Sequence, residues 1–359
     1  MKVSKGKLIK RIVIITLCVL IVLFCLASFF GVMYVYKDMF GRADIPEFTA
    51  CLRYEDVKDE YSREDVEFES DGNTLQGHIY GDTESARALV VISHGLGGYS
   101  ESYLSETLYF VDNGYAVFGY DNTGSGESEG EGTTGMAQSR IDLDSALSFV
   151  EENEKLSNLP VLLYGHSWGG YAVTSILSSE HDIAASASVA GYNTPMEIIL
   201  EFGEEMMSVP LAYLEYPFLW LNNKIIFGEN SDISAVDSIN SCDTPVMLIH
   251  GKTDETVEYN GASIISHRDE ITNPNVKFKT VEGEYSGHNS LYMTEEAFDY
   301  SEELTESHEE LAKEYDGEIP HDVEKEFFDS IDKEVVSGIS DEFMNDVNEF
   351  YMSVLEKYN

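Results

Sequence analysis

Basic residues are scarce in this chain of 359 residues, where 22 Lys and Arg stand against 66 Asp and Glu. The formal net charge is −44. Long-range repulsion of this size opposes binding of the folded part to nucleic acid or to an anionic membrane surface. We therefore expect no nucleic-acid partner, and we interpret the acidic excess as a solvated shell.

Cysteine is also rare, and two of the four cysteines, Cys18 and Cys25, lie inside an apolar N-terminal run. The other two, Cys51 and Cys242, could form one bridge in an exported domain or remain free thiols, and the sequence favours neither. The cysteines and scattered acids lack the ligand spacing of a zinc site, and the chain has no phosphate-binding P-loop. We expect chemistry that needs no cofactor.

The N-terminus departs from the acidic pattern, because an uncharged run at 12–36 follows five basic residues, Lys2, Lys5, Lys7, Lys10 and Arg11. As a helix this run would span about 37 Å, more than the ~30 Å of a hydrocarbon core. The apolar region of a cleavable signal peptide is shorter, usually ~7–15 residues. Lipidation is disfavoured because Leu17 and Phe24 precede the cysteines where a small residue is needed. We predict a cytoplasmic basic tip and transmembrane signal anchor at 1–37, with the remainder outside the cell membrane.

Beyond a polar stalk at 38–62, alternating strands and helices indicate one domain at 63–359. Strands at 66–69 and 76–80 flank Asp71-Gly72-Asn73, a signal for a tight hairpin turn. Further strands are predicted at 88–93, 115–120, 160–164, 183–189, 245–250 and 276–281, and helices at 101–111, 136–151, 170–177 and 261–271. An antiparallel start followed by repeated βα units predicts an α/β fold, with a mostly parallel eight-stranded sheet and helices on both faces.

Two segments depart from this alternation. The segment at about 193–240 is rich in apolar and aromatic residues, and we predict a helical cap. Its apolar side chains could simply dock the cap or could roof an acyl-binding pocket. The segment at about 295–359 is an acidic helical extension. Its last helix, which we expect to begin after Ser340 and to close the sheet, carries one apolar face made of Phe343, Val347, Phe350, Tyr351 and Val354.

A candidate nucleophile lies between a predicted strand and the following helix, in Gly165-His166-Ser167-Trp168-Gly169. A serine at such a turn takes strained backbone angles, and the flanking glycines let the helix pass close to the strand. The hydroxyl then projects above the sheet, where amides at the helix N-terminus can stabilise a negative charge. We predict that Ser167 is the nucleophile of a hydrolase.

A serine hydroxyl needs a base within hydrogen-bond reach, and the base needs an acid that orients it. Asp254 follows the strand at 245–250, and His288 lies in a glycine-containing loop after the strand at 276–281. The order Ser, Asp, His is that of the α/β-hydrolase fold. We therefore predict a triad of Ser167, Asp254 and His288, with Glu255 and Glu258 as the nearest alternatives for the acid. We expect His94 to be structural.

These motifs are specific enough to show a resemblance. From residue 64 to residue 292 the chain resembles the α/β-hydrolases of the monoacylglycerol lipase and serine aminopeptidase S33-like (lysophospholipase-type) group. The resemblance is carried by Ser93–Gly98, by Asp121–Ser128, by the turn around Ser167 and by the two partner loops. It implies that the backbone amides of Leu96 and Trp168 form the oxyanion hole. One departure is Thr123, where the D-x-R-G-x-G-x-S motif of the group has arginine.

The expected function is a membrane-anchored serine hydrolase that cleaves carboxylic esters of apolar acyl groups through an acyl-enzyme. One alternative is a serine peptidase on the same scaffold, whose cap acids would hold the free amine of a substrate. The candidate acids are Glu201, Glu204, Glu205 and Glu215. Another alternative is a catalytically silent binding protein. The expected partners are a small acyl ester or peptide and, through the N-terminal helix, a membrane.

Overall fold

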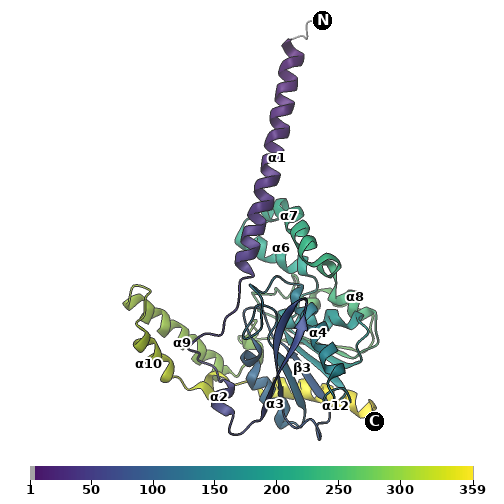
Figure 1. Ribbon diagram of the computed structural model, residues 1–359, viewed down its shortest axis with the longest axis vertical. Coiled ribbons are helices and arrows are strands. Elements are labelled where there is room, and N and C mark those ends of the chain that lie inside the picture. Colours follow the sequence, from purple (N-terminus) through teal and green to yellow (C-terminus); the bar gives the residue numbers. More distant parts are fainter. Residues whose placement is uncertain (1–4, 359) are drawn as a thin grey trace.

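Eight strands form a single sheet in the order β1-β2-β4-β3-β5-β6-β7-β8 (Figure 1). The computed structural model describes residues 5–358, so Lys2 of the basic tip lies outside the described residues. The strands are β1 (Arg63–Ser70), β2 (Asn73–Tyr80), β3 (Leu89–Ser93), β4 (Ala116–Tyr120), β5 (Val161–His166), β6 (Ile183–Val189), β7 (Val246–Gly251) and β8 (Val276–Val281). The predicted eight-stranded α/β architecture is confirmed.

The sheet begins with the predicted hairpin. β1 pairs antiparallel with β2, and Ser70 lies opposite Asn73. The two turn residues between them, Asp71 and Gly72, have φ angles of 45° and 84°, as a two-residue hairpin turn requires. β2 is antiparallel to β4, whereas all the pairs from β4 to β8 are parallel. The carboxyl ends of the parallel strands therefore meet at one edge of the sheet.

Helices cover both faces of the sheet. One face packs against α4 (Gln138–Glu152), α5 (Trp168–Ser175) and α8 (Ala235–Asn240), and the other against α3 (Leu104–Asp112) and α12 (Asp341–Tyr358). All five residues of β3 are buried, and alternate ones belong to the two opposite cores. A strand buried on both faces tends to be apolar, which is why residues 89–92 of β3 form an unbroken aliphatic run.

The C-terminal helix lies as expected. The N–H of Phe343 donates to the Ser340 hydroxyl at 3.3 Å just before the first turn of α12. The five residues of the predicted apolar face are all buried: Phe343, Val347, Phe350, Tyr351 and Val354.

The helix expected at 261–271 is wrong in type and extent. A shorter 3₁₀ helix, η4 (Ile264–Glu270), takes its place and has non-helical angles at His267. The carboxylate of Glu201 binds the Ala262 amide at 2.6 Å and holds the preceding chain out of a helix. Downstream, Pro274 disfavours helical angles at the residue before it. The residues between these two points form 3₁₀ turns instead of a regular α-helix.

The N-terminal helix α1 (Lys5–Met39) rises from the body, and its last turns contact the cap (Figure 1). By length and composition it is the one helix among residues 5–358 that could cross a membrane.

The cap consists of α6 (Pro195–Met206) and α7 (Val209–Phe227), and the 3₁₀ helix η3 (Gly228–Asp232) leads on to α8. Three further 3₁₀ helices are η1 (Ser100–Tyr103), η2 (Ile176–Ser178) and η5 (Ser290–Tyr292).

The segment after α1, predicted to be a stalk, lies along the body and contains α2 (Tyr54–Val57). Its Leu52 amide donates to the Ser337 hydroxyl at 2.8 Å.

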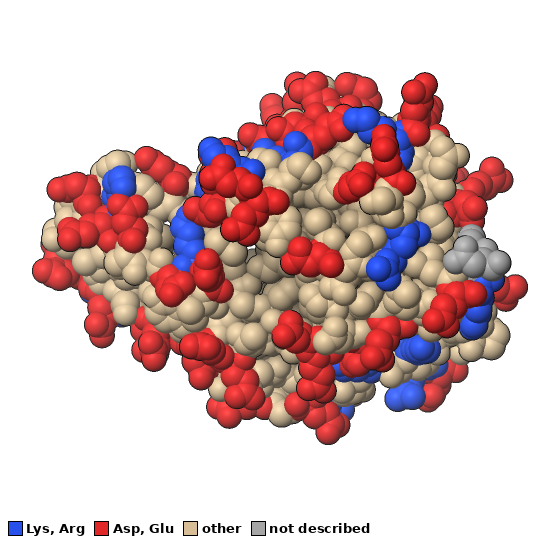
Figure 2. All heavy atoms as spheres, turned by 90° about the horizontal axis from the view of Figure 1, so that it is seen from below, with Lys and Arg blue, Asp and Glu red and all other residues tan. Residues whose placement is uncertain are grey.

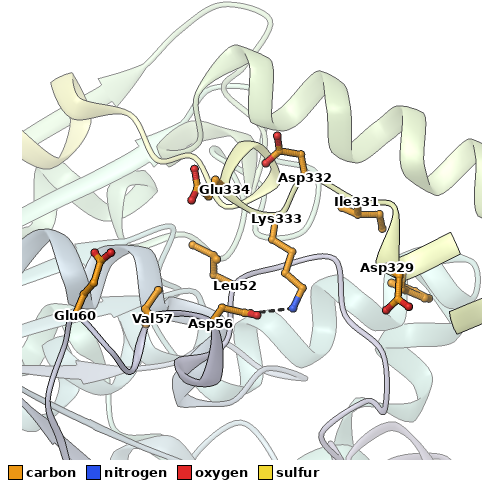
Figure 3. A pocket seen from close by; sticks show the side chains of 10 residues that line it. Leu52, Asp56, Val57, Glu60, Asp329, Ile331, Asp332, Lys333 and Glu334 are labelled. Atoms are coloured by element: carbon orange, nitrogen blue, oxygen red, sulfur yellow. Dashed lines mark hydrogen bonds and ion pairs between the residues drawn. The ribbon is translucent and has the colours of Figure 1, made fainter. Parts of the chain in front are cut away.

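Helices α9 (Glu295–Glu314) and α10 (His321–Asp329) project sideways as an arm, which returns through α11 (Lys333–Val336) (Figure 1). Where the arm meets α2, a pocket of about 620 Å³ is lined largely by acids, and Lys333 pairs with Asp56 at 2.8 Å (Figure 3).

The cysteines do not pair within the part of the chain that the structure describes. Cys51 and Cys242 are both free, as are the two cysteines of α1. Of the two possibilities that the sequence left open, the structure has the free thiols.

Candidate active site

Ser167 lies at the sharp turn between β5 and α5. Its φ of 56° and ψ of −115° fall outside the regions that side-chain-bearing residues prefer. A Cβ atom at Gly169 would lie 1.9 Å from the carbonyl oxygen of Ser93, and one at Gly165 would lie 2.3 Å from that of Gly169. Only glycine fits at these two positions. The strained turn predicted from the sequence is present, and it places Ser167 at the carboxyl edge of the sheet.

Asp254 and His288 meet at the same edge, although they come from different loops. Nδ1 of His288 lies 2.8 Å from Oδ2 of Asp254. The other carboxylate oxygen accepts from the amides of Thr256 and Val257, both at 2.9 Å. Because a carboxylate accepts, Nδ1 carries the proton and Nε2 keeps its lone pair. The alternative acids Glu255 and Glu258 are exposed to solvent.

The carboxyl group of Asp254 is held in its ionised form. Burial acts to raise its pKa, but hydrogen bonds from His250 and His288 and from the Val257 amide outweigh burial and hold the pKa well below its ordinary value. Nε2 of His250 lies 3.2 Å from Oδ2. His250 was not predicted as a site residue, and its only sequence signal is its place at the end of β7.

A cavity of about 510 Å³ opens over Ser167 and His288. The loop from Gly95 to Gly98, including Leu96, forms part of its wall. The other lining residues are mixed: Met136, Tyr192, Ile198, Phe202, Val257 and Tyr292 are apolar or aromatic, and Ser102, Thr256 and Asn289 are polar. Trp168 is the first residue of α5, so its amide has no acceptor within the helix. The arrangement offers an acyl group an apolar wall beside a serine, an imidazole and free amides.

Comparison with known proteins identifies the fold. Residues 84–215 match the family model described as serine aminopeptidase, S33. An esterase from Pyrococcus furiosus superposes with a TM-score of 0.52 at 20% identity, over 77% of this chain and 98% of the esterase. An α/β-hydrolase from Vibrio vulnificus gives a TM-score of 0.54 at 15% identity, over 76% and 92%. The chain has the α/β-hydrolase fold.

Curated relatives match the chain over shorter stretches. Human monoglyceride lipase is 31% identical over 112 residues, which are 31% of this chain and 36% of the lipase. The quorum-quenching protein AidA of Acinetobacter baumannii is 28% identical over 165 residues, 45% of this chain and 52% of that protein. The chain thus spans about half or less of the length of these relatives. The segment of this chain that matches the S33 family model contains Ser167 and ends before Asp254 and His288.

A second buried histidine, His166, connects three parts of the candidate site. The amide of Gly95 donates to the Tyr103 hydroxyl at 3.0 Å, and that hydroxyl lies 2.8 Å from Nδ1 of His166. Nε2 of His166 lies 3.0 Å from the backbone carbonyl of His288 and must donate to it. His166 therefore accepts from Tyr103, and we call this chain of contacts the His166 relay. Sequence reasoning missed it, because the residues are far apart along the chain.

His94 is structural, as predicted. The amide of Asn122 donates to its Nε2 at 2.9 Å, so its Nδ1 is the donor to the Gly95 carbonyl at 2.8 Å. Burial lowers the pKa of His94, and this keeps the imidazole neutral. The side chain links the Gly95–Gly98 loop to the loop after β4.

Thr123, where the group has arginine, satisfies a buried carboxylate with neutral donors. Asp142 accepts from the Thr123 amide at 2.8 Å and from its hydroxyl at 2.9 Å. Ser70 and Gln138 also donate to Asp142, at 2.7 and 3.0 Å. Burial still raises the pKa of Asp142, because these donors compensate only part of the lost hydration.

The cap covers the cavity with α6 rather than with α7. Ile198 and Phe202 of α6 line the cavity over Ser167. Most apolar residues of the segment at 193–240 do not line this cavity. Several on α7 are exposed instead: Leu211, Tyr213, Leu214 and Trp220.

Proposed function

We propose that this α/β-hydrolase is a membrane-anchored serine hydrolase that cleaves carboxylic esters with apolar acyl groups. The observation that supports this most strongly is that Ser167 and His288 line one cavity and that Asp254 is bonded to His288. Ser167 lies there on a strained turn, and His288 lies there with Asp254 hydrogen-bonded to its Nδ1.

The proposed reaction follows from the proton positions. Nε2 of His288 takes the proton of Ser167 as the hydroxyl attacks the ester carbonyl. The amides of Leu96 and Trp168 stabilise the oxyanion, and the ionised Asp254 stabilises the imidazolium that forms. The imidazolium returns the proton to the leaving alcohol. Water, activated by the same imidazole, then releases the acyl group from Ser167.

The cap acids support an ester rather than a free-amine substrate. Glu201 accepts from the amides of Glu258 and Ala262, at 2.8 and 2.6 Å, so it ties the cap to the Asp254 loop. Glu215 accepts from Ser28 at 2.9 Å. Among the described residues that line the cavity over Ser167, no carboxylate faces a substrate amine. A peptidase of the aminopeptidase type would need such a charge.

The membrane placement rests on α1 and its basic end. A span that begins after Lys10 and Arg11 puts the basic tip in the cytoplasm by the positive-inside tendency. The hydrolase domain then lies outside the cell membrane.

The function is tested by Ser167→Ala, with Ser148→Ala at an exposed position of α4 as the matched control. Turnover of a short p-nitrophenyl ester should fall by a factor on the order of 10⁶ in Ser167→Ala and stay unchanged in the control. Parental turnover in Ser167→Ala would refute the proposal.

Two further measurements separate the alternatives. A fluorophosphonate should label the parent and Ser148→Ala but not Ser167→Ala, whereas a silent binding protein would not be labelled at all. Faster cleavage of aminoacyl amides than of monoacylglycerols would favour the peptidase.

A further inference from the structure

The last turns of α1 lie against the cap although they belong to the apolar run. The rings of Phe24 and Phe218 pack edge to face with centroids 6.1 Å apart. Ser28 donates to Glu215 at 2.9 Å, and the Tyr36 hydroxyl donates to Asn223 at 3.1 Å. Helix α7 therefore crosses α1 between Phe24 and Tyr36, over more than three helical turns.

This contact fixes the depth of α7 relative to a bilayer. A 30 Å core needs about 20 residues of the uncharged run at 12–36, so its outer edge lies between Gly31 and Tyr36. At 1.5 Å per residue, Phe24 then lies about 10–18 Å inside that edge. The part of α7 that contacts Phe24 must enter the same leaflet.

The surface of the cap suits that depth. Nine large apolar side chains between Met206 and Ile226 are exposed: Met206, Val209, Leu211, Tyr213, Leu214, Trp220, Leu221, Ile225 and Ile226. Within α7 the only charged residues are Glu215, one oxygen of which accepts from Ser28, and Lys224, which pairs with Asp232. A helix that is apolar on all sides is typical of burial in a core or in a membrane. In water this surface would be costly, whereas in a leaflet it is matched to its surroundings.

An apolar groove of about 440 Å³ runs between α1 and the cap at this level. Gly31 and Val35 lie on its α1 side, and Ile199, Gly203 and Leu219 lie on its cap side. Helix α6 separates the groove from the cavity over Ser167, because Ile199 and Gly203 face the groove while Ile198 and Phe202 face the cavity.

We propose that α7 is immersed in the outer leaflet and that the groove between α1 and the cap holds one acyl chain of a bilayer lipid. This rests on the proposed membrane span and deepens the proposed function, because it makes lipid esters of the membrane the substrate class. Lipid acyl chains surround the protein at this depth, so they fill an apolar groove that opens there. A chain in the groove lies one helix away from Ser167.

The immersion of α7 is tested with the two native tryptophans. Trp168 is buried in the core, whereas Trp220 is 42% exposed on α7. The full chain, carrying Ser167→Ala so that no lipid is consumed, is placed in nanodiscs of phosphatidylcholine with or without bromine on the acyl chains. Brominated lipid should reduce the emission, and Trp220→Phe should abolish that loss. Equal emission in both lipids would overturn the immersion.

The groove is tested by photo-crosslinking to a phosphatidylcholine with a diazirine in its acyl chain. A Cβ at Gly31 meets no neighbouring atom within 4 Å, so Gly31→Leu fills the groove without a clash. Phe30→Leu introduces the same residue at a neighbouring exposed position. Adducts on peptides of α6 and α7 that line the groove should fall several-fold in Gly31→Leu and persist in Phe30→Leu.

Unchanged adducts in Gly31→Leu would overturn the groove assignment, as would the absence of adducts on these peptides of α6 and α7 in the chain with Gly31 intact. Both experiments use the Ser167→Ala chain and do not depend on turnover. A failed ester assay would instead refute the proposed hydrolysis and leave these results standing.

Discussion

The imidazole of His166 is held at both nitrogens, which fixes it between two loops of the candidate site. Burial, and then repulsion from the neighbouring His288, lower the pKa of His166 to about 3, so the ring stays neutral at physiological pH. A neutral ring with its proton on Nε2 can donate only to the His288 carbonyl and accept only from Tyr103. Because Tyr103 also accepts from Gly95, the His166 relay couples the position of His288 to the proposed oxyanion loop.

The relay predicts a specific effect of Tyr103→Phe. The Gly95 amide and Nδ1 of His166 would both lose their partner, and each unsatisfied buried group costs about 1–3 kcal/mol. We expect kcat for ester hydrolysis to fall about 10-fold or more with little change in KM, because small displacements in a catalytic site are costly. Tyr109→Phe, which removes an exposed hydroxyl bonded to Asn345, is the control. A parental kcat in Tyr103→Phe would contradict the coupling.

A second prediction concerns Glu106 and the pH dependence of the free energy of unfolding. Its side chain is 2% exposed and one carboxyl oxygen has no hydrogen-bond partner, and burial raises the pKa to about 7. The folded chain therefore holds this proton more tightly than the unfolded chain. The associated stability is fully present below the unfolded pKa of about 4.3 and is lost as the pH rises through about 7.

We expect Glu106→Gln to remove this pH dependence. Relative to the parent, the variant should gain about 3 kcal/mol in unfolding free energy between pH 4 and pH 8, as follows from a pKa difference of two to three units. Urea unfolding of the solubilised chain at the two pH values measures the gain. An equal difference between variant and parent at both pH values would show that Glu106 does not titrate in this way.

At the scale of elements, glycine decides whether β5 and α5 can meet at the serine turn. Gly169 faces a carbonyl oxygen with no room for a methyl group, whereas Gly72 in the β1–β2 turn has a φ of +84° and open space around it. Replacement by alanine therefore tests a steric requirement at Gly169 and a conformational requirement at Gly72.

Gly72→Ala should cost about 1–2 kcal/mol, the usual penalty for a left-handed residue with a side chain. Gly169→Ala should cost more, about 3 kcal/mol or above, because the turn must shift to relieve the clash, and it should also abolish ester hydrolysis. Thermal unfolding of the two variants gives the comparison. Equal losses of melting temperature with activity retained in Gly169→Ala would refute the steric explanation.

Secondary structure could be predicted wherever it depends on neighbouring residues. The strands and the helices α3, α4 and α12 follow from apolar periodicity, and the serine turn follows from its glycines. The helix expected at 261–271 failed because a distant group, Glu201, fixes the chain before it. The faces of α7 could not be predicted either, since a helix that is apolar on all sides contains no signal for orientation.

At the scale of the whole molecule, charge and apolar surface lie in different places. On the face directed away from α1, acidic side chains outnumber the basic ones scattered among them (Figure 2). The exposed apolar residues of the body lie instead on the cap beside α1. An acidic domain is repelled by anionic headgroups, so the apolar cap is the part suited to approach the bilayer.

The proposed topology predicts opposite accessibility of the two ends of the molecule. In a background with Cys51 and Cys242 replaced by serine, Glu303→Cys on α9 should react with a membrane-impermeant maleimide in intact cells. Gly6→Cys in the basic tip should react only after permeabilisation. The reverse pattern would place the domain in the cytoplasm.

The sequence by itself determined the α/β architecture, the strained serine turn and the chain order of Ser167, Asp254 and His288, because these depend on local periodicity and turn chemistry. Only the tertiary structure decided which groups meet. The contact of His288 with Asp254 joins residues 34 apart, and that of His166 with the His288 carbonyl joins residues 122 apart. Such contacts depend on the packing of the whole sheet, as does the placement of α7 against α1, and no local pattern encodes them.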